Sequence, residues 1–333
     1  MGAPEMTETP EHARAGGQVL SMLGRPLNCL TVEALGRRPM RLGDLLKELG
    51  GPSQTTLRGR LTDLVALGAV VKRGGGMPYA VENELTDAGR DLLHVVKAIE
   101  AWLAHAPEGP IRLGSVAAKG AIKALAGGWE STMLRAFAAR PLSLTQLDRL
   151  IGGLSYPALE RRLGALRATG LVEATPAEAR TPYRISRWGR EGMGPLIAAA
   201  RFERLHMSGL ATPLTHIDIE AAFLLATPIA ALHARIDGVC QLAAQVDSRQ
   251  RLAGVNIVID RGKIVECAAR LEPKPRTWAI GDTHAWLEAL VRRDRGTLTI
   301  GGDEALVHGI VEALHDALYQ SSGNGRAVEP SGR

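Results

Sequence analysis

The chain has 333 residues, a hydrophobic fraction of 45% and a net charge of +5 at pH 7, which is typical of a core-forming protein with two or three domains. Its three cysteines, Cys29, Cys240 and Cys267, are widely spaced. This spacing argues against a disulfide framework or a zinc ribbon and is typical of a cytoplasmic protein. The longest apolar stretch, 221–232, is too short to span a membrane and contains Pro228, so we expect no membrane partner.

The positive charge is concentrated in the middle third of the chain. Residues 107–210 hold 15 Lys and Arg against 8 Asp and Glu, whereas residues 1–106 hold 12 of each and residues 211–333 hold 13 against 15. The middle third is therefore the part that would attract a polyanion such as DNA.

The strongest pattern is an internal repeat, in which one module occurs twice, 102 residues apart. Fourteen residues of the first copy recur without a gap in the second, and such self-similarity is the first guide to the fold. The recurring residues of the first copy are Leu23, Arg38, Pro39, Leu42, Leu45, Gly50, Gly51, Ser53, Leu57, Arg60, Leu61, Leu64, Gly68 and Val70.

Apolar spacing in the first copy predicts a series of helices followed by a β-hairpin. Gly50, Gly51 and Pro52 end the third helix, because Gly adopts left-handed backbone and Pro cannot continue a helix, and Ser53 is a good N-cap for the next. This order is that of a winged helix-turn-helix. The expected helices are 19–23, 27–35, 42–49, 54–67 and 86–105, and the expected wing strands are 70–73 and 79–82.

The second copy predicts the same order with a shorter closing helix. Two linkers, 106–120 and 208–215, flank it. The expected helices are 121–125, 130–138, 144–151, 155–169 and 194–207, and the expected strands are 171–173 and 183–186.

The helix at 54–67 is the predicted DNA-reading helix of the first copy. Leu57, Leu61 and Leu64 share one face and must be buried, which leaves a polar face toward the groove. Residues at the N-terminal turn of such a helix reach base edges, and basic residues beside it contact phosphates. The predicted base-reading residues are Gln54 and Thr55. The outward face also carries Thr62, with Arg58 to one side, as further predicted DNA contacts, and the predicted phosphate contacts are Arg60, Lys72 and Arg73.

The corresponding surface of the second copy is more basic and has fewer base-reading groups. Tyr156 takes the place of Gln54. We therefore expect copy 1 to read sequence and copy 2 mainly to hold the DNA backbone. The predicted contacts of the second copy are Tyr156, Arg161, Arg162, Arg180 and Arg184. The alternative is that these helix-turn-helix modules serve protein–protein assembly.

After residue 216 the pattern changes to a mixed α+β domain. Asp260, Arg261 and Gly262 form a predicted hairpin turn. The expected helices are 219–236, 282–291 and 303–319, and the expected strands are 239–246, 254–259, 263–270, 277–280 and 297–300.

Both copies resemble HxlR-type winged-helix regulators. The first does so through LSMLGRPLNCLTVEAL, LRGRLTDLVALGAVVKR and Pro78-Tyr79, and the second through LAGGWESTMLRAF, LERRLGALRATGLVE and Pro182-Tyr183. The resemblance implies DNA binding by paired recognition helices. Two copies in one chain would then imitate the homodimer that is usual in the family, and their helices are free to diverge.

The last third resembles a sterol carrier protein-like domain, through GVNIVID at 254–260, TWAIG at 277–281 and the Gly296, Gly302 and Asp303 region. That resemblance implies a curved sheet covered by helices and the binding of a hydrophobic small molecule. Candidate ligand-binding residues are mainly aromatic, although such residues are more often simply core. They are Trp278, Trp286, Phe223, Leu224 and His284, with Trp188 and Phe202 at a domain junction as a further possibility.

Other chemistry has little support in the sequence. The nine His are scattered, so no metal site is expected, and Cys267 on a predicted strand is more typical of a core residue than of a nucleophile. The sequence contains no phosphate-binding loop, dinucleotide fingerprint or nucleophile elbow. We therefore expect neither a cofactor nor an enzymatic activity.

The sequence thus predicts an α+β protein with two tandem winged helix-turn-helix domains, 18–106 and 119–207, and a sterol carrier-like domain, 216–319. Disordered ends are expected at 1–17 and 320–333. The expected function is a DNA-binding transcriptional regulator that senses a hydrophobic small molecule. Two alternatives stay open: a sequestration protein for such compounds, and a constitutive DNA architectural protein. A monomer with two recognition helices and a homodimer with four are both compatible with the sequence.

Overall fold

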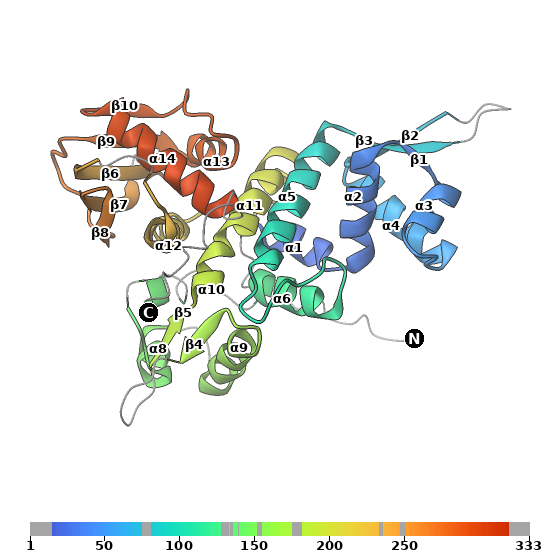
Figure 1. Ribbon diagram of the computed structural model, residues 1–333, viewed down its shortest axis with the longest axis horizontal. Coiled ribbons are helices and arrows are strands. Elements are labelled where there is room, and N and C mark those ends of the chain that lie inside the picture. The colour runs from blue at the N-terminus through green and yellow to red at the C-terminus, as the bar shows by residue number, and fades with distance from the viewer. Residues whose placement is uncertain are drawn as a thin grey trace, which may run out of the picture.

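The computed structural model describes residues 15–74, 81–127, 133, 136–138, 140–151, 155–174, 182–232, 236–246 and 251–319. Figure 1 shows three groups of elements along the chain: blue to cyan helices with a small sheet, a green group, and a yellow to red group built on a larger sheet. The first two groups correspond to the two sequence repeats, and the third to the segment after residue 216.

The first repeat is a helical bundle with a three-stranded sheet of order β1-β3-β2. The buried faces of its helices supply a continuous apolar core. Its elements are α1 (Gly17–Leu23), α2 (Pro26–Arg37), β1 (Met40–Arg41), α3 (Leu42–Glu48), α4 (Gln54–Ala66), β2 (Val70–Arg73), β3 (Glu82–Leu85) and α5 (Asp87–Ala104).

Two expectations for this repeat are wrong at their boundaries. The second wing strand is Glu82–Leu85 rather than 79–82, because Asn83 and Leu85 alternate inward while Asn83 donates a hydrogen bond to the Met40 carbonyl (3.1 Å). Residues 79 and 80 lie outside the described residues. The ordered chain also begins before residue 18: Ala15 is buried, and the Gly16 amide donates to Glu203 (2.7 Å).

The second repeat follows the same order as far as it is described. Its first helix is longer than expected, and its closing helix is preceded by a short extra one. Part of the helix expected at 130–138 lies outside the described residues, and 136–138 are helical. Its elements are α6 (Val116–Gly127), α8 (Leu144–Leu150), α9 (Tyr156–Ala168), β4 (Val172–Ala174), β5 (Tyr183–Ile185), α10 (Arg187–Glu191) and α11 (Met193–His206).

The two repeats share the local structure that joins the wing to the closing helix. In the first, the Thr86 hydroxyl donates to the Gly68 carbonyl (2.6 Å) and accepts from the amide of Gly89 (3.0 Å). In the second, the Ser186 hydroxyl donates to the Gly170 carbonyl (2.7 Å) and accepts from the amide of Gly189 (2.9 Å). Both motifs tie the start of the closing helix to the end of the helix before the wing.

Equivalent helices of the two repeats pack on one another: α1 on α6, and α5 on α11. Two polar pairs cross this interface, one near each end of α5. Asp91 early in α5 contacts His206 at the end of α11 (2.8 Å), and Glu191 in α10 contacts His105 just after α5 (3.7 Å). This reciprocity is that of an isologous interface, in which the same surface meets itself.

Trp102 and Trp188 form the centre of the contact between the repeats. Their rings stack at 4.5 Å with an interplanar angle of 9°, and both side chains are buried. Each indole N–H donates to the backbone carbonyl of the other tryptophan, at 3.0 and 2.8 Å. The pair therefore fixes α10 against the end of α5.

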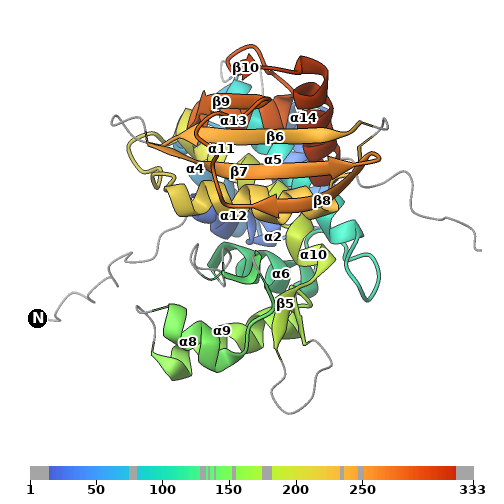
Figure 2. The same ribbon diagram turned by 90° about the vertical axis from the view of Figure 1, so that its left-hand side faces the viewer.

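The C-terminal group is a five-stranded sheet of order β10-β9-β6-β7-β8 with helices on one face. Figure 2 shows its open face toward the viewer, with α13 and α14 behind it. The elements are α12 (His216–Ala226), the 3-10 helix η1 (Thr227–Ile229), β6 (Gly238–Gln245), β7 (Leu252–Asp260), β8 (Lys263–Ala268), β9 (Trp278–Asp282), α13 (Thr283–Arg292), β10 (Thr299–Gly301) and α14 (Glu304–Tyr319).

The hairpin predicted at 260–262 is confirmed, since Arg261 and Gly262 both have positive φ (49° and 73°). The helix expected at 219–236 is wrong in its length. It ends at Ala226, and Pro228 lies in the 3-10 turn that follows, because proline has no N–H for the next helical hydrogen bond.

Candidate nucleic-acid interface

Helix α4 presents a polar face to solvent, as its sequence predicts. Leu57, Leu61 and Leu64 are buried, and the Ser53 hydroxyl caps the helix by accepting from the Thr56 amide (3.1 Å). The predicted base-reading residues Gln54 and Thr55 are exposed, as are the other two predicted DNA contacts of this helix, Arg58 and Thr62.

Two of the predicted phosphate contacts near α4 are held by carboxylates. Arg60 pairs with Asp63 (3.1 Å) on the same helix, and Arg73 pairs with Glu84 (2.5 Å) across the wing. Lys72 is exposed. Exposed ion pairs contribute little free energy, so Arg60 and Arg73 can exchange their carboxylate for a phosphate at small cost.

Helix α9 is the equivalent element of the second repeat. Leu159, Leu163 and Leu166 are buried, whereas Tyr156 is 45% exposed at the first turn and Arg161 is exposed. Arg162 is half-buried, and Arg184 pairs with Glu173 across the second hairpin (2.7 Å). Arg180 lies outside the described residues.

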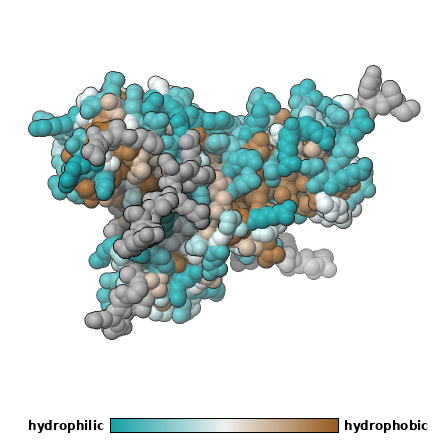
Figure 3. All heavy atoms as spheres, in the orientation of Figure 1, coloured by the Kyte–Doolittle hydropathy of each residue, from teal (hydrophilic) through white to brown (hydrophobic). Residues whose placement is uncertain are grey.

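The two helices lie in separate lobes. In Figure 1, α4 and α9 are found on either side of the packed pair α1 and α6. Figure 3 shows mostly hydrophilic residues on this face, with apolar residues visible over the first repeat and over part of the C-terminal group. The structure therefore presents two exposed helices, α4 and α9, whose first turns are open to solvent and which are joined by the packed helices of the two repeats.

The predicted ligand residues are brought together only in part. Phe223 and Trp286 meet edge to face at 4.9 Å, and the Trp286 N–H donates to the Ala243 carbonyl (2.8 Å). Both line an apolar pocket between α11, α12 and α13. This pair is the one part of the predicted constellation that surrounds a common space.

Trp278 does not join Trp286, which corrects the expectation that they share a pocket. Alternation along β9 buries Ala279 on the helix-covered face, opposite Leu242, and turns Trp278 to the open face, where its ring lies over Gly301. His284 is half exposed and lies 4.0 Å from Glu288.

The other three candidates lie in packed contacts outside this pocket. Leu224 is buried, and its carbonyl accepts a bond from Arg190 (3.2 Å). Trp188 belongs to the stacked pair with Trp102, and Phe202 packs on His206 at 4.8 Å.

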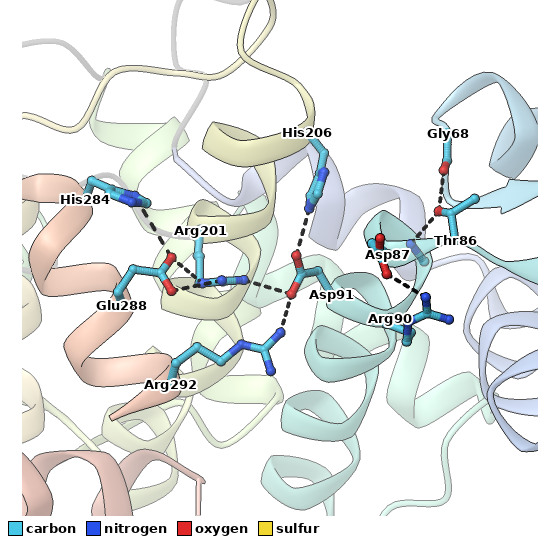
Figure 4. Close-up of polar contacts among 11 residues, drawn as sticks. Gly68, Thr86, Asp87, Arg90, Asp91, Arg201, His206, His284, Glu288 and Arg292 are labelled. Atoms are coloured by element: carbon cyan, nitrogen blue, oxygen red, sulfur yellow. Dashed lines mark hydrogen bonds and ion pairs between the residues drawn. The ribbon is translucent and has the colours of Figure 1, made fainter. Parts of the chain in front are cut away.

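Sequence reasoning missed an ion network that joins the three groups of elements. Arg201 of α11 donates to both carboxylate oxygens of Glu288 on α13 (2.7 and 2.9 Å) and to Asp91 on α5 (2.9 Å). Asp91 also pairs with His206 and with Arg292, as Figure 4 shows. Arg201 is the available signal, because it stands among apolar residues on a helix that is buried nearly all round.

The network fixes the charge state of Asp91. Burial favours the neutral carboxyl, but hydrogen bonding to His206 and the charge of Arg201 outweigh it and lower the pKa of Asp91 from 3.8 to about 2. Asp91 is therefore ionised at neutral pH and forms stable pairs with the cations around it.

The cysteines are unreactive in this fold. Burial raises the pKa of Cys29 and Cys240 to about 12 and that of Cys267 to about 11, so all three are protonated thiols at neutral pH. Among the described residues, no group of three His, Cys, Asp or Glu side chains is placed to hold a metal ion. No helix in the described part of the chain is long and apolar enough to cross a membrane.

Comparison with known families identifies the first repeat. Residues 22–108 match the HxlR-like helix-turn-helix family, so this part of the chain contains an HxlR-like helix-turn-helix domain. The family suggests a DNA-binding transcriptional regulator, and DNA is the partner that it implies. A search of curated proteins gave no match to the chain.

Proposed function

We propose that this protein is a non-enzymatic transcriptional regulator that binds double-stranded DNA through two winged helices in one chain and responds to a hydrophobic small molecule. The observation that carries the proposal is the exposed, N-capped helix α4 within the HxlR-like domain. An exposed helix of this kind is the element that enters the major groove in helix-turn-helix proteins.

The second winged helix is supported by its detailed agreement with the first. The same leucines are buried in α4 and α9, and the same hydroxyl bridge joins the wing to the closing helix. The reciprocal packing of α1 with α6 and of α5 with α11 supports an arrangement in which the two repeats act like two subunits of a dimer.

The recognition helices differ, and this supports an asymmetric operator. Gln54 and Thr55 offer hydrogen-bonding side chains at the start of α4, whereas Tyr156 and Pro157 occupy the start of α9. We infer that α4 reads bases and that α9 contributes mainly backbone contacts through its arginines.

Selection of DNA from a randomised library, followed by binding measurements at two salt concentrations, tests this proposal. We expect a preferred sequence whose affinity falls steeply with salt, because each phosphate contact releases a counterion. Gln54→Ala should abolish preference in one half of the site, while Tyr156→Ala should leave preference unchanged. Equal loss from both variants would refute the division of roles.

The hydrophobic effector is supported by the third group of elements. Its five-stranded sheet covered by helices on one face agrees with a sterol carrier-like domain, and an apolar pocket lies beside Phe223 and Trp286. Retention of a hydrophobic compound by a protein that shows no salt-sensitive, sequence-specific DNA binding would favour sequestration instead.

A further inference from the structure

The pocket beside Trp286 lies at the joint between the second repeat and the C-terminal group. One wall is a single face of α11, the others belong mainly to α12 and α13, and Ala15 and Leu214 complete the lining. Of the residues that line it, Asp218 and Thr283 are polar and the rest are apolar.

The charge at this joint disfavours an anion. The polar lining includes the carboxylate of Asp218, and the apolar walls would leave a charged ligand without solvation. An uncharged ring or short chain instead matches the aromatic pair Phe223 and Trp286 and the aliphatic side chains around them.

The pocket is too small for such a molecule without movement. Its internal volume is about 50 Å³, whereas an apolar cavity known to bind benzene measures about 150 Å³. A ring that enters must therefore push the lining apart, and we infer that α11 moves away from α12 and α13.

An ion clamp opposes that movement. Arg201, one residue beyond the pocket residue Ala200, holds Glu288 of α13 with two hydrogen bonds. The same guanidinium holds Asp91 of α5 in the first repeat. Helix α11 also packs against α1 and α5. A shift of α11 relative to α13 would therefore also change its contacts with the first repeat.

We propose that this pocket is the effector site, that it takes a compact uncharged apolar molecule, and that entry of the molecule works against the Arg201–Glu288 clamp to displace α11. The inference rests on the proposed ligand response and goes beyond it by naming the site, the ligand class and the element that moves. The ligand changes DNA affinity because it binds the displaced state of α11 more tightly than the resting one.

Fluorine NMR of protein labelled with 5-fluorotryptophan tests the site, with toluene as the probe. The chain has five tryptophans. Toluene should shift the Trp286 resonance saturably and leave that of Trp278, on the open face of the sheet, unchanged. Benzoate, its anionic analogue, should shift neither. The site is refuted if Trp286 does not respond, or if Trp278 responds equally.

A filling variant checks that the shift reports the pocket itself. Ala222→Leu should weaken toluene binding at least tenfold, because Ala222 lines the pocket. Ala211→Leu is the matched control, since Ala211 is also partly exposed but does not line the pocket. Equal affinities in the two variants would overturn the assignment.

The clamp has its own variant and control. Glu288→Gln weakens the pair with Arg201. It should tighten toluene binding several-fold, because less free energy is then needed to separate α11 from α13. Glu312→Gln removes a comparable charge from an exposed pair with Arg293 and should leave binding unchanged. No difference between the two variants would refute the clamp.

DNA affinity of the same samples separates this inference from the proposed function. Toluene should alter the affinity of the wild-type protein for its selected DNA. Specific DNA binding without a Trp286 shift would refute the pocket as the effector site but not the proposed DNA-binding function. A Trp286 shift with unchanged DNA affinity would refute the coupling, and a shift in a protein that binds no specific DNA would refute the regulator.

Discussion

Replacing Trp188 by Phe tests whether the stacked tryptophan pair sets the contact between the repeats. The variant loses the hydrogen bond from the Trp188 N–H to the Trp102 carbonyl, worth about 1 kcal/mol. That carbonyl still accepts from the His105 amide (3.1 Å), so it is not left unpaired. The smaller ring also gives up packing in a buried site, at a cost of roughly 1 kcal/mol. The free energy of unfolding should therefore fall by about 2 kcal/mol.

Urea denaturation followed by circular dichroism measures this loss, and Trp278→Phe is the control because Trp278 lies on the open face of the sheet, away from the repeats. DNA binding is measured on operators whose halves are moved apart by single base pairs. Trp188→Phe should tolerate more spacings than the wild type, because the repeats are less firmly joined. An equal loss of stability in the control, or an unchanged spacing preference, would refute this role.

Three further predictions concern stability. Arg201→Met should cost about 3 kcal/mol in urea denaturation, because it leaves the Glu288 carboxylate, only 14% exposed, without its bidentate partner; a loss below 1 kcal/mol would contradict this. Burial lowers the pKa of His94 from 6.5 to about 4, so between these values only the unfolded state takes up the proton. The free energy of unfolding should therefore be highest above pH 6.5 and decline toward pH 4, and His94→Gln should flatten this decline. Gly189→Ala should cost about 2 kcal/mol, because its Cβ would lie 2.3 Å from the Leu171 carbonyl oxygen; wild-type stability would show that the backbone yields.

The repeated part of the fold was predictable because local signals and apolar spacing agree there. Ser53 starts α4 as an N-cap, and the left-handed Gly68 ends it. The recognition face follows directly, since three buried leucines leave only one side of the helix to solvent.

The ligand pocket was predictable only in part, because it depends on which side of a strand faces the helices. A one-residue change in register exchanges the two faces, and the residues around Trp278 do not fix that register. The part that α11 plays in this pocket was not predicted, because α11 becomes a wall only when the C-terminal group packs against it. The polar strand Glu82–Leu85 was misplaced for a related reason: its buried Asn83 is satisfied by the carbonyl of Met40, a residue far away in sequence.

The partnership between Asp91 and Arg201 was likewise beyond sequence reasoning. The two residues are 110 positions apart, and each belongs to a helix whose neighbours could not be known from periodicity. Charged residues on nearly fully buried helices are nonetheless a useful warning of such networks, because a buried charge requires a partner.

The covalent connection between the repeats has a consequence for dosage. Two subunits that associate only as a dimer separate on dilution, so their activity depends on how much protein the cell contains. Here the contact between α5 and α11 is intramolecular, and its effective concentration is set by the chain rather than by expression. The paired geometry is therefore present in each single molecule, however few copies there are.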